Sequence, residues 1–94
     1  MSNAIKATIE VKPQTHGRME YRSVNVDGNT ITIDRFCVQT GADTFKPTEW
    51  HLFRNGHEYS EFRTEAELVT HLQTCALVPR KTITRVAKAL MNAA

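Results

Sequence analysis

Two dipeptides that favour tight hairpin turns, Asp27-Gly28 and Asn55-Gly56, constrain the fold of this chain more than any other feature of its sequence. Both residues of such a pair tolerate the positive φ angles that a two-residue turn between antiparallel strands requires. Each pair is flanked by segments rich in β-branched and aromatic residues, which are typical of strands. We therefore predict one β-hairpin centred on residues 27–28 and a second centred on residues 55–56.

A further strand is predicted before these hairpins. Four apolar residues alternate there with polar ones, which is the pattern of a half-buried strand: Ile5, Ala7, Ile9 and Val11. Pro13 is expected to end this strand, because proline cannot donate a hydrogen bond to a ladder. Residues 13–17 and 39–47 are interpreted as loops.

Two helices are predicted at the C-terminal end. Thr64 and Glu67 have the spacing of a capping box, so the first helix is expected to begin at Thr64. Its expected buried stripe consists of Ala66, Leu68, Val69, Leu72, Cys75 and Ala76. Val78-Pro79 separates it from a second helix. The apolar residues of that helix recur at helical spacing: Ile83, Val86, Ala87, Leu90 and Ala94.

These elements predict the α+β fold class: a four- to five-stranded antiparallel β-meander followed by two C-terminal α-helices packed on one face of the sheet. A length of 94 residues suits a single domain, 1–94. Residues 1–3 are polar and are expected to be disordered or a remnant of cloning. No apolar run is long enough for a membrane span and no export signal is present, so we expect a soluble, cytoplasmic protein with Cys37 and Cys75 reduced.

The register of the first hairpin predicts that its apolar residues change faces. Near the turn, one face carries Val24, Val26, Ile31 and Ile33, and farther out the opposite face carries Met19, Tyr21, Phe36 and Val38. Two interpretations remain open. Bulges near 22–23 and 34–35, or strand twist, return all eight residues to one core, or the hairpin presents an apolar patch to a partner.

The second hairpin has a simpler pattern. A two-residue turn at 55–56 sets Leu52 opposite Tyr59 and Trp50 opposite Glu61. Trp50, Leu52 and Tyr59 are then expected in the core. Phe53 points to the other face and is left as a surface aromatic.

These side chains and the sheet edge suggest a binding function. The protein-interface candidates are Met19, Tyr21, Phe36, Val38 and Phe53, since Tyr, Phe and Met are enriched at the centres of interfaces. A free edge strand offers a second route to association. We expect a small non-enzymatic protein–protein interaction module of the adaptor or inhibitor type, which binds another protein or forms a homodimer. By analogy with other proteins of this size, the chain is expected to be encoded by a phage or another mobile element.

No catalytic, cofactor or metal site is predicted. His71 and Cys75 lie four residues apart on the first helix, but a closed metal site needs four ligands. His51 faces Ser60 across the second hairpin, and such a pair arises easily by chance. We therefore expect no enzymatic activity, no cofactor and no bound metal.

Positive charge is concentrated at the C-terminal end. Residues 79–94 carry four basic residues and no acidic one, whereas residues 1–78 carry eight basic and ten acidic residues. The segment Val78–Leu90 resembles the recognition helix of helix-turn-helix DNA-binding proteins. The resemblance implies contacts to bases and phosphates from Arg80, Lys81, Thr84, Arg85 and Lys88. A nucleic-acid-binding protein that uses the basic C-terminal helix 79–91 is the alternative function, and a solvated face on a core-packed helix is the structural explanation of the same pattern.

Overall fold

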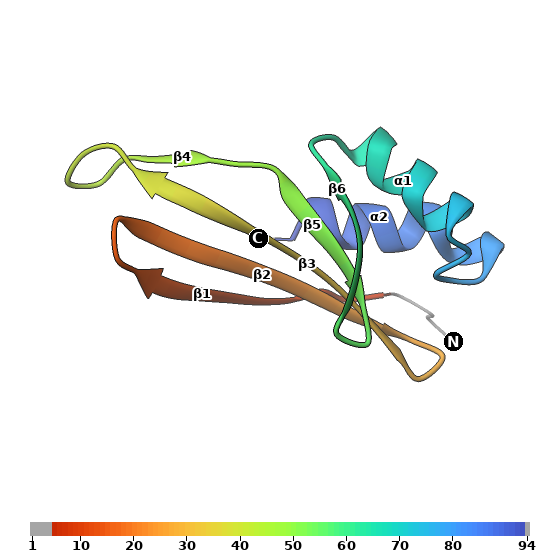
Figure 1. Ribbon diagram of the computed structural model, residues 1–94. Helices are drawn as coiled ribbons and strands as arrows, with labels where there is room; N and C mark the ends of the chain where they lie inside the picture. The colour runs from red at the N-terminus through yellow and green to blue at the C-terminus, as the bar shows by residue number, and fades with distance from the viewer. Residues whose placement is uncertain (1–4, 94) are drawn as a thin grey trace.

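The computed structural model describes residues 5–93 and confirms the α+β fold class, with strands first and helices last (Figure 1). The expectations for residues 1–3 and for Ala94 lie outside this range. The elements are β1 (Thr8–Gln14), β2 (Gly17–Val26), β3 (Asn29–Gln39), β4 (Phe45–Pro47), β5 (Trp50–Arg54), β6 (His57–Phe62), α1 (Glu65–Thr74), a 3₁₀ turn η1 (Arg80–Thr82) and α2 (Ile83–Met91).

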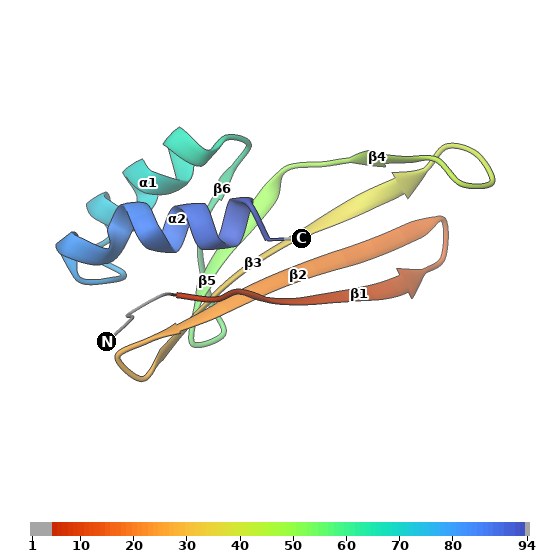
Figure 2. The ribbon, with the colours of Figure 1, turned by 180° about the vertical axis from the view of Figure 1, so that it is seen from behind.

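The strands form one antiparallel sheet in the order β1-β2-β3-β5-β6, with β4 paired to the outer end of β3. Both helices cover the same face of the sheet, near the β2–β3 turn (Figures 1 and 2). The outer ends of β2 and β3 extend beyond the helices. The strand number exceeds the expected four to five because the predicted loop 39–47 contains the short strand β4.

Both predicted hairpin turns are present. The φ angles are 52° and 83° at Asp27 and Gly28, and 51° and 85° at Asn55 and Gly56. Two consecutive positive values are the signature of the type I′ turn, whose twist matches that of the strands. The first hairpin also has the predicted register, in which Met19 pairs with Phe36.

Strand β1 differs from its prediction, because it begins and ends later and continues through Pro13. The proline is tolerated because β1 is an edge strand. Of the four alternating apolar residues, only the two that precede the strand pack against the core. Ile5 and Ala7 pack partly against the core, whereas Ile9 and Val11 are exposed.

The second hairpin contains a bulge that the sequence did not predict. Leu52 pairs with Ser60 instead of Tyr59, and Trp50 pairs with Phe62. Tyr59 is the extra residue and is 38% exposed, so its prediction as a core residue is wrong. Trp50 and Leu52 are buried as predicted.

One cluster of buried apolar side chains joins the helices to the sheet. The strands contribute Val24, Val26, Ile31, Ile33, Trp50, Leu52 and Phe62. The helices and their connection contribute Leu68, Leu72, Leu77, Val78, Ile83, Val86, Ala87 and Leu90. Removal of this surface from water is the main force that holds the helices on the sheet.

The start of α1 is as predicted and its end is not. The Thr64 hydroxyl accepts a hydrogen bond from the Glu67 amide at 3.2 Å, and the Glu67 carboxylate accepts one from the Thr64 amide at 3.0 Å. The helix ends before Cys75, so Cys75 and Ala76 are exposed, as is Ala66. Within residues 5–93, neither helix has the length and apolar character that crossing a lipid bilayer requires.

Candidate functional site

The sheet face opposite the helices, here called the open face, carries all five predicted interface candidates. Side chains alternate between faces along a strand, and the burial of Val24 and Ile33 under the helices identifies the covered face. The alternate positions of β2, β3 and β5, which face the other way, are those of the five candidates: Met19, Tyr21, Phe36, Val38 and Phe53. Neither helix lies on this side of the sheet (Figures 1 and 2).

The change of apolar face follows from an unbroken hairpin. Pairing runs from Val26–Asn29 to Gly17–Val38 with no register shift. The bulges considered near residues 22–23 and 34–35 are therefore absent, and strand twist does not return the outer residues to the buried core cluster, so the single-core interpretation is wrong. The apolar side chains at the outer ends of β2 and β3 are directed away from the core.

Four of the candidates form a continuous surface, the open-face patch, which consists of Met19, Tyr21, Phe36 and Val38. Met19 and Phe36 are direct cross-strand partners, and the Phe36 ring leans over Gly17. A Cβ atom at Gly17 would lie 2.6 Å from this ring and would collide with the backbone of β3. Val38 is 39% exposed, whereas the other three side chains are half-buried by their neighbours within the sheet.

An acidic cluster around His51 lies on the same face, at β3, β5 and β6, and consists of this histidine with Glu49, Glu58, Glu61 and Asp34. The Nδ1 atom of His51 lies 2.9 Å from the Glu58 carboxylate and 3.9 Å from that of Glu61, and its Nε2 atom lies 3.9 Å from Glu49. Asp34 is the cross-strand partner of His51 on β3. The hydrogen bond to Glu58 raises the pKa of His51 against the effect of burial, and the charges of the nearby carboxylates add to this rise.

Three members of this cluster have the side chains and spacing to hold a metal ion. The ligand atoms of Glu49, His51 and Glu61 lie within 4.8 Å of one another. Imidazole and carboxylate groups are ligands of zinc and related ions. Glu49 is also 3.5 Å from the Arg63 guanidinium, and His51 is hydrogen-bonded to Glu58, so internal pairing accounts for the arrangement.

The acidic cluster could not be predicted from the sequence, because it depends on the β5–β6 bulge. In the predicted register His51 faces Ser60, and the extra residue Tyr59 brings Glu61 opposite His51 instead. No glycine marks this bulge in the sequence. The only available signal was the alternation that places Glu49 and His51 on one face of a strand.

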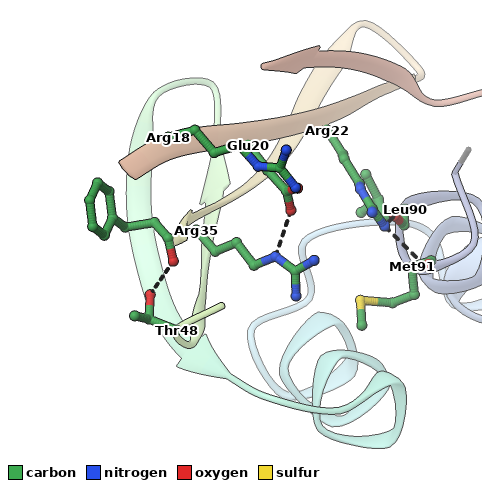
Figure 3. Close-up of polar contacts among 8 residues, drawn as sticks. Arg18, Glu20, Arg22, Arg35, Thr48, Leu90 and Met91 are labelled. Carbon is green, nitrogen blue, oxygen red and sulfur yellow. Dashed lines mark hydrogen bonds and ion pairs between the residues drawn. The ribbon is translucent and has the colours of Figure 1, made fainter. Parts of the chain in front are cut away.

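The helix-covered face ends in an arginine cluster, where β2 and β3 extend beyond α2 (Figure 3). The Glu20 carboxylate accepts hydrogen bonds from Arg35 at 2.7 Å and from Arg18 at 3.2 Å. The guanidinium carbons of Arg22 and Arg35 lie 4.9 and 4.2 Å from the centre of the Trp50 ring. Cations at this distance from an indole are attracted by its π system.

The arginine cluster connects the sheet to the C-terminal end of α2. Arg22 donates hydrogen bonds to the carbonyls of Leu90 and Met91 at 2.9 and 3.0 Å (Figure 3). Burial favours a higher pKa for Glu20, but the hydrogen bond and charge of Arg35, with the charges of the other arginines, hold this pKa below its ordinary value. Glu20 therefore stays ionised among the arginines. Close by, the Thr48 hydroxyl donates to a main-chain carbonyl of β3 at 2.8 Å.

The predicted nucleic-acid candidates are all exposed: Arg80, Lys81, Thr84, Arg85 and Lys88. The predicted helix 79–91 is divided into η1 and α2, with the first two candidates on η1. Lys81 and Arg85 line a hollow between α2 and the β2–β3 turn. The connection 75–79 is longer than the three- or four-residue turn of helix-turn-helix proteins.

Comparison with protein-family models, curated proteins and solved structures found no significant match to this chain. Function is therefore inferred from three surfaces of the molecule. These are the open face with its apolar patch and acidic cluster, the arginine cluster, and the exposed basic side of η1 and α2.

Proposed function

We propose that this protein is a non-enzymatic binding module, of the adaptor or inhibitor type, that recognises another protein through the open face of its sheet. The observation that carries the proposal is the open-face patch, whose four apolar side chains lie where neither helix covers them. The solvated face of an antiparallel sheet usually carries polar side chains instead. Tyr, Phe and Met are the residue types that interface centres favour.

The acidic cluster beside the patch indicates the charge of the partner. Glu49, Glu58 and Glu61 lie within 4 Å of His51, and Asp34 adjoins them. An apolar segment flanked by lysine or arginine complements such a surface. Charge complementarity raises the association rate and excludes partners of the wrong sign. The partner class is therefore a protein with a basic, apolar docking segment.

Aspartate substitutions in the patch test this proposal. Val38→Asp and Tyr21→Asp each place a negative charge in the patch. The control, Ala66→Asp, places the same charge at an exposed position of α1. A partner captured from host cells by the unchanged chain is identified by mass spectrometry, purified, and titrated against each folded variant. We expect both patch variants to weaken its affinity at least tenfold, which corresponds to about 1.4 kcal/mol, with Ala66→Asp unchanged.

Circular dichroism establishes that each variant is folded before it is titrated. Partner affinity that stays equal in the unchanged chain and in both folded patch variants would exclude the open-face patch as the binding surface. Affinity for the true partner is also expected to fall with salt, because opposite charges attract across the interface.

A second candidate function is nucleic-acid binding through η1 and α2. The observation that favours it is the exposure of Lys81, Arg85 and Lys88 on a segment without acidic residues. Fluorescence anisotropy with duplex DNA at low salt tests it. Binding should weaken steeply with salt and be lost in Lys81→Glu/Lys88→Glu, whereas Lys46→Glu on β4 serves as the control. No binding at low salt removes this candidate.

A further inference from the structure

Among the described residues, strand β1 forms a free edge of the sheet and has exposed apolar side chains. It pairs with β2 on one side, and neither helix crosses its other side (Figures 1 and 2). Ile9 is 37% exposed and Val11 49%, and both lie on the helix-covered side of the sheet. The unpaired outer edge of this seven-residue strand is a template for a further strand.

The turn between β1 and β2 determines which backbone groups face this free edge. Gln14 and Gly17 flank a two-residue turn and therefore form a hydrogen-bonded pair. Such pairs alternate with non-bonded ones along an antiparallel ladder, so the N–H and C=O groups of Ile9 and Val11 point away from β2. Pro13, like Ile9 and Val11, has its backbone groups directed toward the free edge. Its lack of an N–H group therefore affects the edge and not the β1–β2 ladder.

We propose that a second copy of this chain pairs antiparallel with β1 about a two-fold axis at Val11, which gives a homodimer with one continuous sheet. The proposal rests on the proposed function, protein recognition by the sheet, and names a second copy as the partner of its edge. In this register Val11 faces the same residue of the second copy. Glu10 faces Lys12, and Ile9 faces Pro13.

Charge selects this register over its neighbours. An axis at Val11 sets Glu10 opposite Lys12 twice, on the open face. An axis one residue earlier sets two glutamates opposite each other, and an axis one residue later sets two lysines opposite each other. Directly opposed like charges destabilise a strand pair, whereas opposite charges stabilise it.

The backbone fits the same register. The two Val11 residues exchange both of their outward hydrogen bonds, and each Ile9 N–H reaches the carbonyl of Pro13 in the other copy. Lysine and proline on an edge strand discourage indiscriminate pairing. Here Lys12, whose Nζ atom lies 3.8 Å from the Glu10 carboxylate of its own chain, gains a second carboxylate partner, and Pro13 still offers its carbonyl.

The dimer has a consequence for the proposed function. A two-fold axis between antiparallel strands is perpendicular to the sheet, so the helices of both copies lie on one side and the two open faces join on the other. The joined surface presents two open-face patches, which permits bivalent binding of a repeated or dimeric partner. The contact is at the small end of stable interfaces, below about 1,200 Å². We therefore expect a concentration-dependent dimer.

Charge exchange on β1 tests both the dimer and its register. Sedimentation velocity from micromolar to millimolar concentration should show the unchanged chain passing from monomer to dimer. Glu10→Lys alone and Lys12→Glu alone should each weaken dimerisation about tenfold or more, because each sets like charges opposite each other. The double exchange Glu10→Lys/Lys12→Glu should restore it, and the two single variants should associate when mixed. Lys46→Glu, an exposed lysine on β4, is the control.

Each alternative outcome overturns the proposal. A chain that stays monomeric at millimolar concentration has no such dimer, and single variants that dimerise unchanged exclude this edge. Failure of the mixed variants to associate excludes the register. If dimerisation is lost in Val38→Asp and kept in Glu10→Lys, the contact between copies lies on the open face instead.

The dimer and the proposed function can fail separately. A monomer that binds a partner through the patch overturns only the dimer. A β1 dimer whose partner does not contact the patch overturns only the proposed function.

Discussion

Ala76 follows α1 in a left-handed conformation that residues with a Cβ atom rarely adopt. Its φ angle is 51°. Its amide donates to the Gln73 carbonyl at 3.2 Å, and the Leu77 amide donates to the Leu72 carbonyl at 3.1 Å. These two bonds form a Schellman motif, whose left-handed position is usually glycine. We predict that Ala76→Gly raises the free energy of unfolding by about 0.5–1 kcal/mol, as measured by urea denaturation.

A glycine elsewhere in a helix should have the opposite effect. Ala89 lies within α2 and is partly buried. Ala89→Gly is expected to lower the free energy of unfolding by about 1 kcal/mol, because glycine has the greater backbone freedom in the unfolded chain. Equal losses in the two variants would contradict the strain assigned to Ala76.

At the scale of the elements, Arg22 ties α2 to the sheet in addition to the apolar core. It donates to two carbonyls at the C-terminal end of α2 and lies against Trp50. We predict that Arg22→Met lowers the free energy of unfolding by about 1.5–3 kcal/mol, the usual value for hydrogen bonds from a charged group. Hydrogen exchange in the last turn of α2 should also become faster.

Arg63→Met is the matched control for this prediction. The Arg63 side chain is 72% exposed, and its contact with Glu49 is a surface ion pair. Loss of such a pair is expected to change stability by no more than about 0.5–1 kcal/mol. An Arg22→Met variant as stable as this control would show that the carbonyl contacts of Arg22 do not anchor α2.

The β5–β6 hairpin should make stability depend on pH through His51. The pKa of this histidine is raised above 6.5, its ordinary value, first by the hydrogen bond to Glu58. A raised folded-state pKa means that the stabilising effect is complete below about 6.5 and is lost as pH rises through the folded-state pKa. We predict that the stability advantage of the unchanged chain over Glu58→Gln declines across this range.

NMR titration and urea denaturation at several pH values check the prediction. The His51 resonance should titrate above 6.5 in the unchanged chain and nearer its ordinary value in Glu58→Gln. Glu65→Gln, on α1, is the control and should leave the His51 titration as it is. A His51 pKa that is the same in all three proteins would contradict the role assigned to Glu58.

At the scale of the whole molecule, one shared core should make sheet and helices unfold together. Leu90 of α2 is fully buried in this core. We predict that Leu90→Ala lowers the free energy of unfolding by about 2–5 kcal/mol. The fluorescence of Trp50, the one tryptophan of the chain, reports on the sheet, and helical circular dichroism reports on α1 and α2. Both signals should change at the same denaturant concentration, and two separate transitions would contradict a common core.

The two faces of the molecule also differ in charge. The acidic cluster lies on the open face, whereas the arginine cluster and the basic residues of η1 and α2 lie on the helix side. The formal net charge of +2 conceals this separation. A basic partner is therefore attracted to the open face, and an anionic one to the opposite side.

The local features of this fold follow from short stretches of the sequence. The turns at 27–28 and 55–56 require positive φ angles that Asp, Asn and Gly tolerate, and Thr64 with Glu67 starts a helix by hydrogen bonds within four residues. The register of the first hairpin followed from its turn alone. These features depend only on residues close together in the chain. The fold class, and the face of the hairpin on which the patch residues lie, could therefore be predicted.

Which surfaces remain uncovered depends on how the helices pack on the sheet. The helices pack near the β2–β3 turn, so the apolar outer part of that hairpin lies on the open face, while Ile9 and Val11 stay exposed on β1. The bulge at Tyr59 brings Glu61 opposite His51. The position of the helices depends on contacts between segments far apart in the chain, and the bulge pairs Trp50 with Phe62, both of which enter the core that the helices complete. Local patterns therefore cannot predict them.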